Sequence, residues 1–170
     1  MSPSHPSPAA APLPVLDCDR SSAAPSPTGL SASLRQARHL LRLASAGIVE
    51  ASGSTNPAYR YAAAHLAALR AAAAVLAVRA RPDAMGSRRG RGSRNVWVLL
   101  SRVAPHLSEW AAYFSAGAPK RAAAEAGLPS VVTTREADDL LRDAELFLTV
   151  VQREINRAEP APANPRSSAA

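Results

Sequence analysis

Arginine is concentrated in one segment of the chain, between residues 79 and 94. Six arginines there oppose a single acidic residue, Asp83, so the segment carries +5 of the chain's net charge of +7. Guanidinium groups bind phosphate oxygens through two parallel hydrogen bonds, and the glycines among the arginines favour a flexible loop. Such a loop is suited to binding an RNA or DNA backbone without reading its sequence. The residues expected to contact nucleic acid are Arg88, Arg89, Arg91 and Arg94.

A simpler interpretation of the same segment stays open. No aromatic residue lies among its arginines, so the segment itself offers nothing for a base to stack on. The chain has 19 arginines and one lysine, Lys120, a composition typical of a GC-rich bacterial genome. A solvated loop whose arginines reflect codon usage is therefore the alternative to a nucleic-acid site.

Arg60 and His65 are the second group with chemical potential and the candidate catalytic residues. An imidazole that titrates near neutral pH acts as acid or base, and an arginine holds a phosphate, so the two types together suit RNA cleavage. Five residues apart on one helix, they point about 140° apart. The pair would meet only at an irregular helix start or with one partner from a second subunit. The alternative for His65 is a packed histidine between Tyr61 and Leu69, hydrogen-bonded to a neighbour.

Metal and cofactor chemistry finds no support in the sequence. Cys18 is the only cysteine, which excludes an internal disulfide and a cysteine-based zinc site. His39, His65 and His106 fall on three separate predicted helices, and no two have the spacing of a helical metal pair. The glycine-rich residues 86–92 lack the lysine of a phosphate-binding loop. We expect neither a metal nor a cofactor.

The elements that would position these residues belong to one domain. Residues 1–29 and 158–170 are rich in proline, and we expect both to be disordered tails. Residues 30–157 remain for a single folded domain. No signal peptide is evident, and the longest uncharged helical stretch, Ala71–Val78, is too short to span a membrane. We expect a cytoplasmic protein without a membrane span.

Helical periodicity runs through this whole domain. A first helix is predicted over residues 34–50, with Ser33 and Gln36 as a capping box. A second begins after the cap Asn56 with Pro57 and continues to about residue 80. Because this second helix is mostly alanine, its neighbours can approach closely, and we place it in the middle of a bundle.

The second half of the domain continues the helical pattern. A third helix is predicted over residues 95–116 with a bend at Pro105, and a short helix over 119–126 that ends at Gly127. The last helix follows a capping box of Thr133 and Glu136 and holds its apolar stripe over five turns. The predicted fold is an all-α, up-and-down bundle of four to five helices.

Four segments of this bundle resemble a known family. Residues 60–70 resemble the second helix of the HEPN domain (higher eukaryotes and prokaryotes nucleotide-binding). Residues 96–100, 103–114 and 135–145 are similar to a group of small stand-alone bacterial proteins, the SAV-type HEPN family. The resemblance covers about residues 34–155, and it implies a helical bundle that is often a homodimer.

Function is implied by the same resemblance. Many HEPN proteins are metal-independent ribonucleases with an arginine followed, after four to six residues, by a histidine at the start of the last long helix. Here that helix begins with Arg135 and contains no histidine, and the matching spacing occurs only at Arg60 and His65. The resemblance thus favours a non-catalytic or weakly catalytic module that binds RNA, nucleotide or a protein partner. A dimeric endoribonuclease of toxin or defence type and a structural protein-interaction domain are the alternatives.

Overall fold

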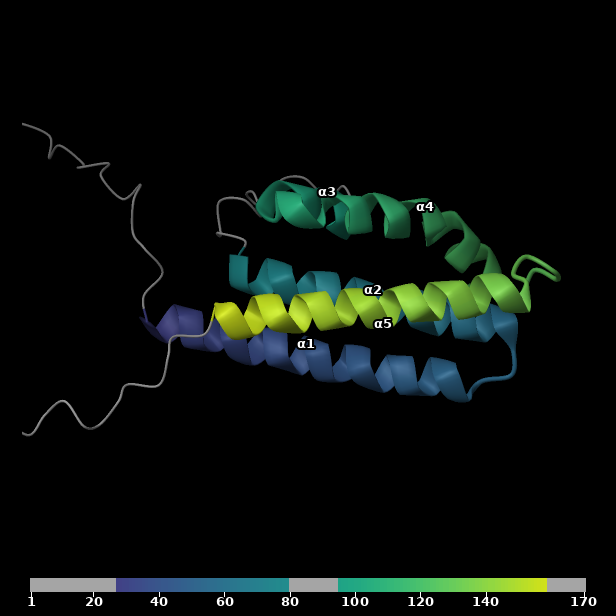
Figure 1. Ribbon diagram of the computed structural model, residues 1–170, viewed down its shortest axis with the longest axis horizontal. Coiled ribbons are helices and arrows are strands. Elements are labelled where there is room, and N and C mark those ends of the chain that lie inside the picture. The colour runs from purple at the N-terminus through teal and green to yellow at the C-terminus, as the bar shows by residue number, and fades with distance from the viewer. Residues whose placement is uncertain (1–26, 80–94, 159–170) are drawn as a thin grey trace, which may run out of the picture.

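The structure, a computed structural model, describes residues 27–79 and 95–158, and all regular elements in these ranges are helices (Figure 1). In chain order they are α1 (Pro27–Gly53), α2 (Pro57–Arg79), α3 (Val96–Val103), the short 3-10 helix η1 (Pro105–Leu107), α4 (Ser108–Glu125) and α5 (Thr134–Arg157). Successive helices alternate in direction, with α3, η1 and α4 together forming one arm of the bundle. The predicted all-α up-and-down bundle is confirmed.

The alanine-rich helix α2 lies at the centre, as its composition predicted. It packs against α1, α5, α4 and α3. Six of its ten buried residues are alanines, and small side chains let neighbouring helix axes come close. By length and composition alone α2 would qualify as a membrane-spanning helix, but 56% of its most apolar 18-residue window is buried inside the bundle. That burial is the pattern of a core helix.

Helix ends follow local chemistry at two of the predicted sites. The Asn56 side chain accepts hydrogen bonds from the backbone N–H groups of Ala58 (3.0 Å) and Tyr59 (3.3 Å) and so caps α2. Thr133 and Glu136 form the reciprocal capping box of α5. Both predicted starts are confirmed.

The start of α1 differs from the prediction. The helix begins at Pro27, so Ser33 lies inside it and caps nothing, and residues 27–29 belong to a helix instead of a tail. Proline disrupts a helix interior but fits its first turn, where its missing N–H would have no partner in any case. The predicted boundary treated Pro27 as a helix breaker and was wrong for this reason.

Two prolines in the second half of the chain behave differently from each other. The bend predicted at Pro105 is confirmed, because α3 ends at Val103 and η1 begins at Pro105. The separate helix predicted from Pro119 is wrong, since α4 continues through that proline to Glu125. Phe114 on one side of Pro119 and Ala124 on the other are both buried, so packing holds the helix continuous. Gly127 ends α4 with a φ of 71°, as expected.

A cluster of aromatic rings joins the α3–α4 arm to α5. Trp97 and Phe114 stack at 5.3 Å, and Phe147 of α5 lies 5.3 Å from Phe114. Trp110 extends the cluster, with its ring 5.5 Å from Phe147. These rings fill space that the small side chains of α2 leave, and they fix the position of the arm.

Gly117 is a point of close approach between α4 and α2. A Cβ atom built there would lie 2.9 Å from the Tyr61 hydroxyl oxygen and 3.5 Å from Cδ2 of His65. We expect Gly117→Ala to lower the free energy of unfolding by about 1–3 kcal/mol, because the core must shift to admit the methyl group. Chemical denaturation would measure the change.

The matched control is Gly53→Ala, at the end of α1. A Cβ atom there would have no neighbour within 4 Å. We expect this variant to be neutral or more stable by up to about 1 kcal/mol, since alanine favours the helix. Equal effects of the two substitutions would contradict the close approach at Gly117.

Candidate functional site

His65 lies in the core of the bundle. Its side chain is 1% exposed, and its Nε2–H donates to the carbonyl oxygen of Phe114 on α4 at 2.8 Å. The ring meets Trp97 and Phe114 edge-on, with centroids 5.9 and 6.0 Å away. Burial lowers the pKa of His65 below its usual 6.5, which favours the neutral imidazole. Its Nδ1 has no hydrogen-bond partner among the described residues.

Arg60, in the first turn of α2, makes contacts that stabilise the fold. Its Nε and Nη2 donate to the carbonyl oxygen of Ser54, at 3.0 and 2.7 Å, and its Nη1 pairs with Asp138 of α5. The guanidinium thus ties the α1–α2 turn to the first turns of α5. Within one chain Arg60 and His65 share no open cleft. Their catalytic role stays a prediction, and it would require His65 to become accessible.

Residues 80–94, which are all of the arginine segment except Arg79, fall outside the part of the chain that the structure describes. That applies to Arg88, Arg89, Arg91 and Arg94, whose role as nucleic-acid ligands stays a prediction. Arg79, the first residue of the segment, and Asn95, which follows its last residue, are described and lie at the same end of the bundle.

The described residues at that end are themselves strongly basic. We define the basic end as residues 27–39, 76–79, 96–107 and 151–157, which the antiparallel order of the helices brings together (Figure 1). It contains six arginines and a single acidic residue, Glu154. The arginines are Arg35, Arg38, Arg79, Arg102, Arg153 and Arg157. The opposite end, residues 47–62 and 118–142, holds five basic and five acidic residues. Charge is therefore divided along the long axis of the molecule.

Glu154 organises the cationic groups of the basic end. Its carboxylate, 13% exposed, accepts from Arg79 of α2 and from Arg157 of α5 at 3.1 Å. Nε2 of His106 on η1 lies 3.4 Å from the same carboxylate. One carboxylate thus holds groups from three elements close together, and a single negative charge leaves two guanidinium groups with an excess of positive charge.

A groove of about 740 Å³ lies at the opposite end of the bundle. Its walls come from the end of α1, the first half of α2 and the loop that follows α4, and most of them are apolar. Its polar side chains include Glu50, Arg70 and Glu125. None of the predictions from the sequence pointed to this groove. Ala58, Ala62 and Leu66, which recur at every fourth residue of α2, are only half-buried and line it.

Comparison with models of protein families identifies the family of this bundle. The model of the SAV-like HEPN family matches residues 51–152, which is more than half of the chain. The chain belongs to this HEPN family. No curated protein and no solved structure matches it.

The resemblance inferred from the sequence is thereby confirmed, with a narrower extent than expected. The matched part of the HEPN protein holds α2 through α5 almost completely, and with them His65 and the aromatic cluster, whereas Glu154 lies just beyond its end. Most of α1 lies outside the match, including Arg35 and Arg38. Part of the basic end is therefore a feature of this chain beyond the matched domain.

The buried state of His65 makes a prediction about pH. The unfolded chain binds a proton at this histidine near pH 6.5, whereas the native chain does so only at lower pH. Because the unfolded state then binds more protons, the free energy of unfolding falls as the pH drops below about 6.5, by at most about 1.4 kcal/mol per pH unit. The loss stops once the pH falls below the native pKa.

His65→Gln is the variant that isolates this effect. Glutamine can still donate to the Phe114 carbonyl but does not titrate. We expect the variant to be less stable at neutral pH and to lose the slope between about pH 6.5 and the onset of carboxylate protonation. Urea denaturation over a pH series measures both. An unchanged slope in the variant would show that another group causes it.

Proposed function

We propose that this HEPN protein is a non-catalytic module that binds RNA through its basic end. The observation that carries the proposal is the division of charge along the bundle, with six arginines against one glutamate at one end and balanced charges at the other. Phosphate neutralisation by arginine supplies most of the affinity in binding that does not depend on sequence. Arg79, Arg157 and His106 converge there from three elements, which gives the phosphates a defined place to bind.

The environment of His65 supports a binding role over cleavage. A general acid or base must reach the atom that it protonates and must titrate near the working pH. His65 is buried and bonded to a backbone carbonyl, and its pKa is lowered. We expect RNA to stay intact when incubated with the pure protein in EDTA. Cleavage that disappears in His65→Gln would instead support the ribonuclease that the Arg60–His65 spacing suggested.

The salt dependence of binding tests the basic end. For single-stranded RNA held through four to six phosphates, log K should fall against log salt with a slope of about −3 to −4. Arg102 and Arg153 are exposed at the basic end, and replacing both with alanine should reduce the magnitude of the slope by about 1. Fluorescence anisotropy of a labelled oligoribonucleotide provides the measurement.

A matched control lies at the opposite end of the molecule. Arg135, 92% exposed, and Arg142 are arginines of α5 near its start, and their double alanine variant removes the same charge. We expect the affinity of this control to stay close to that of the unchanged protein. Equal losses in the two double variants would mean that net charge alone governs binding, and absent binding would exclude the proposal.

The groove favours a second candidate function, a protein-interaction domain whose partner is a second copy of the chain. Apolar side chains are exposed in it, including Leu128, which is 53% exposed. Two copies related by a two-fold axis would cover these surfaces reciprocally. A homodimer is also what the family resemblance led us to expect.

Sedimentation of matched leucine variants tests this second candidate. We expect the unchanged chain to sediment as a dimer and Leu128→Arg to sediment as a monomer, because a buried unpaired charge opposes association. Leu146→Arg, at an equally exposed leucine of α5 outside the groove, should remain dimeric. A monomeric unchanged chain would exclude the dimer.

A further inference from the structure

The α3–α4 arm is connected to α5 mainly through side chains, because the two backbones are rarely close to each other. Few backbone positions of α4 and α5 come near each other, while α4 packs directly on α2. Three polar pairs bridge the space at successive levels, namely Lys120 with Glu136, Tyr113 with Asp143 at 2.6 Å, and His106 with Glu154 at 3.4 Å. Between the last two levels the space is filled by aromatic rings.

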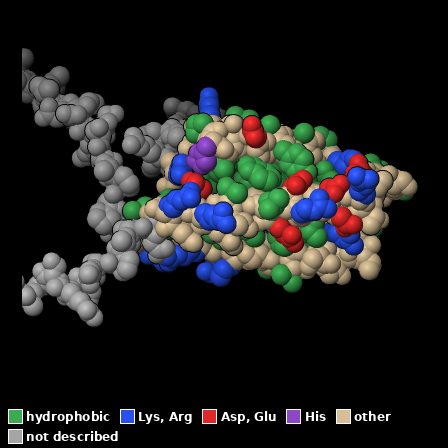
Figure 2. Space-filling model, viewed as in Figure 1, with side chains coloured by type: hydrophobic (Ala, Val, Ile, Leu, Met, Phe, Trp, Pro, Cys, Tyr) green, Lys and Arg blue, Asp and Glu red, His purple; other side chains and the backbone are tan. Residues whose placement is uncertain are grey.

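Two of these rings remain partly open to solvent. Trp110 is half-buried, and its ring packs against Phe114 at 6.1 Å and against Phe147 at 5.5 Å. Tyr113 is 44% exposed and meets Phe114 at 5.1 Å. Both rings thus pack on their inner side against buried aromatic residues. Figure 2 shows apolar side chains gathered over the middle of this face, between the α3–α4 arm and α5.

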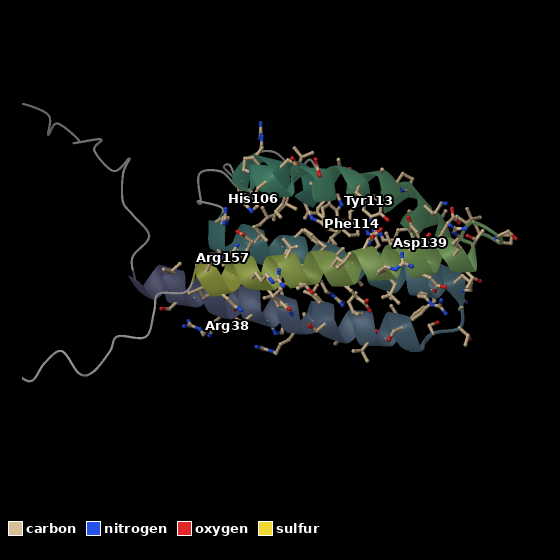
Figure 3. The ribbon with its side chains drawn as sticks, viewed as in Figure 1. Arg38, His106, Tyr113, Phe114, Asp139 and Arg157 are labelled. Carbon is tan, nitrogen blue, oxygen red and sulfur yellow. The ribbon has the colours of Figure 1, made fainter. Side chains whose placement is uncertain are left out.

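The open rings lie beside the cationic groups of the basic end. Trp110 follows His106 by four residues, about one helical turn, and His106 shares Glu154 with Arg79 and Arg157. His106, Tyr113 and Arg157 lie along one side of the molecule in Figure 3. Aromatic rings and phosphate-binding groups therefore occupy a single continuous face.

We propose that this face is a site for single-stranded RNA, with bases stacked on Trp110 and Tyr113 and the adjoining phosphates held by Arg79 and Arg157. The inference rests on the proposed function and specifies its ligand. Every base has a face that can stack on an aromatic side chain, and a strand without base pairs exposes that face. Asp143 of α5 accepts a hydrogen bond from the Tyr113 hydroxyl. Its negative charge repels phosphates from the part of α5 beside Tyr113, so the phosphates lie toward the basic end.

Two matched tyrosine variants test the stacking. Tyr113 and Tyr59 are 44% and 45% exposed, and each donates its hydroxyl hydrogen to a carboxylate, Asp143 and Glu50 respectively. Tyr59 lies at the opposite end of the bundle. We expect Tyr113→Ala to weaken binding of a single-stranded oligouridylate about tenfold and Tyr59→Ala to leave it unchanged. Binding of inorganic polyphosphate should be the same in both variants.

Tryptophan fluorescence can detect base stacking directly, without a variant that weakens binding. The chain has two tryptophans, and Trp97 is buried, so Trp97→Phe leaves Trp110 as the reporter. Stacking of a base on Trp110 should quench its emission when oligouridylate binds, whereas polyphosphate should not. If Trp97→Phe does not fold, the tyrosine pair tests the proposal by itself.

The outcomes separate this inference from the proposed function. Binding of oligouridylate that is equal in the two tyrosine variants would overturn the stacking site. Equal response of Trp110 to oligouridylate and polyphosphate would also overturn it. Either result leaves binding by the basic end in place. If neither oligouridylate nor polyphosphate binds the unchanged protein, the proposed function and the stacking site both fail.

Discussion

Close packing around the small side chains of α2 is the constraint on which the rest of the structure depends. Alanines at its buried positions let α1, α5 and the α3–α4 arm approach one central helix. Gly117 brings α4 near enough for His65 to donate to the Phe114 carbonyl. The same approach sets Phe114 against Trp97 and Phe147. A larger residue at Gly117 would disturb all of these contacts together.

This packing separates the residues that build the HEPN fold from those that can meet a ligand. His65 belongs to the first group, because a neutral, buried imidazole contributes a hydrogen bond and edge-on ring contacts to the core. Arg60 also belongs to it, since its three donors tie the α1–α2 turn to α5. The surface keeps the remaining charge, which the antiparallel helices sort into a basic end and a balanced end. Binding at the basic end would therefore leave the packing of α2 unchanged.

Local signals in the sequence were sufficient for most of the helices. The Asn56–Pro57 start of α2, the capping box of α5 and the bend at Pro105 depend on residues within one or two turns, and all three are confirmed. The predictions at two prolines were wrong, for different reasons. Pro27 occupies a first turn that tolerates it, and Pro119 lies in a helix held together by tertiary packing.

Much less of the candidate site could be predicted from the sequence. The arginines of the basic end are spread over more than 120 positions, from Arg35 to Arg157, and they gather only when the helices fold back on one another. His65 finds its acceptor 49 positions away, and Arg60 finds Asp138 78 positions away. Sequence reasoning did offer a packed, hydrogen-bonded His65 as an alternative, but it could not identify the carbonyl. The cluster of basic residues visible along the chain was the segment between residues 79 and 94.

The most direct measurement of the central claim is a map of backbone amide shifts as a single-stranded oligoribonucleotide is added to the isotope-labelled protein. Our account predicts shifts at the basic end and around Trp110, in the residues near His106 and in the last turns of α5. It predicts little change around Gly127–Val132 at the opposite end. Shifts centred on that opposite end, or none under conditions of low salt, would contradict it.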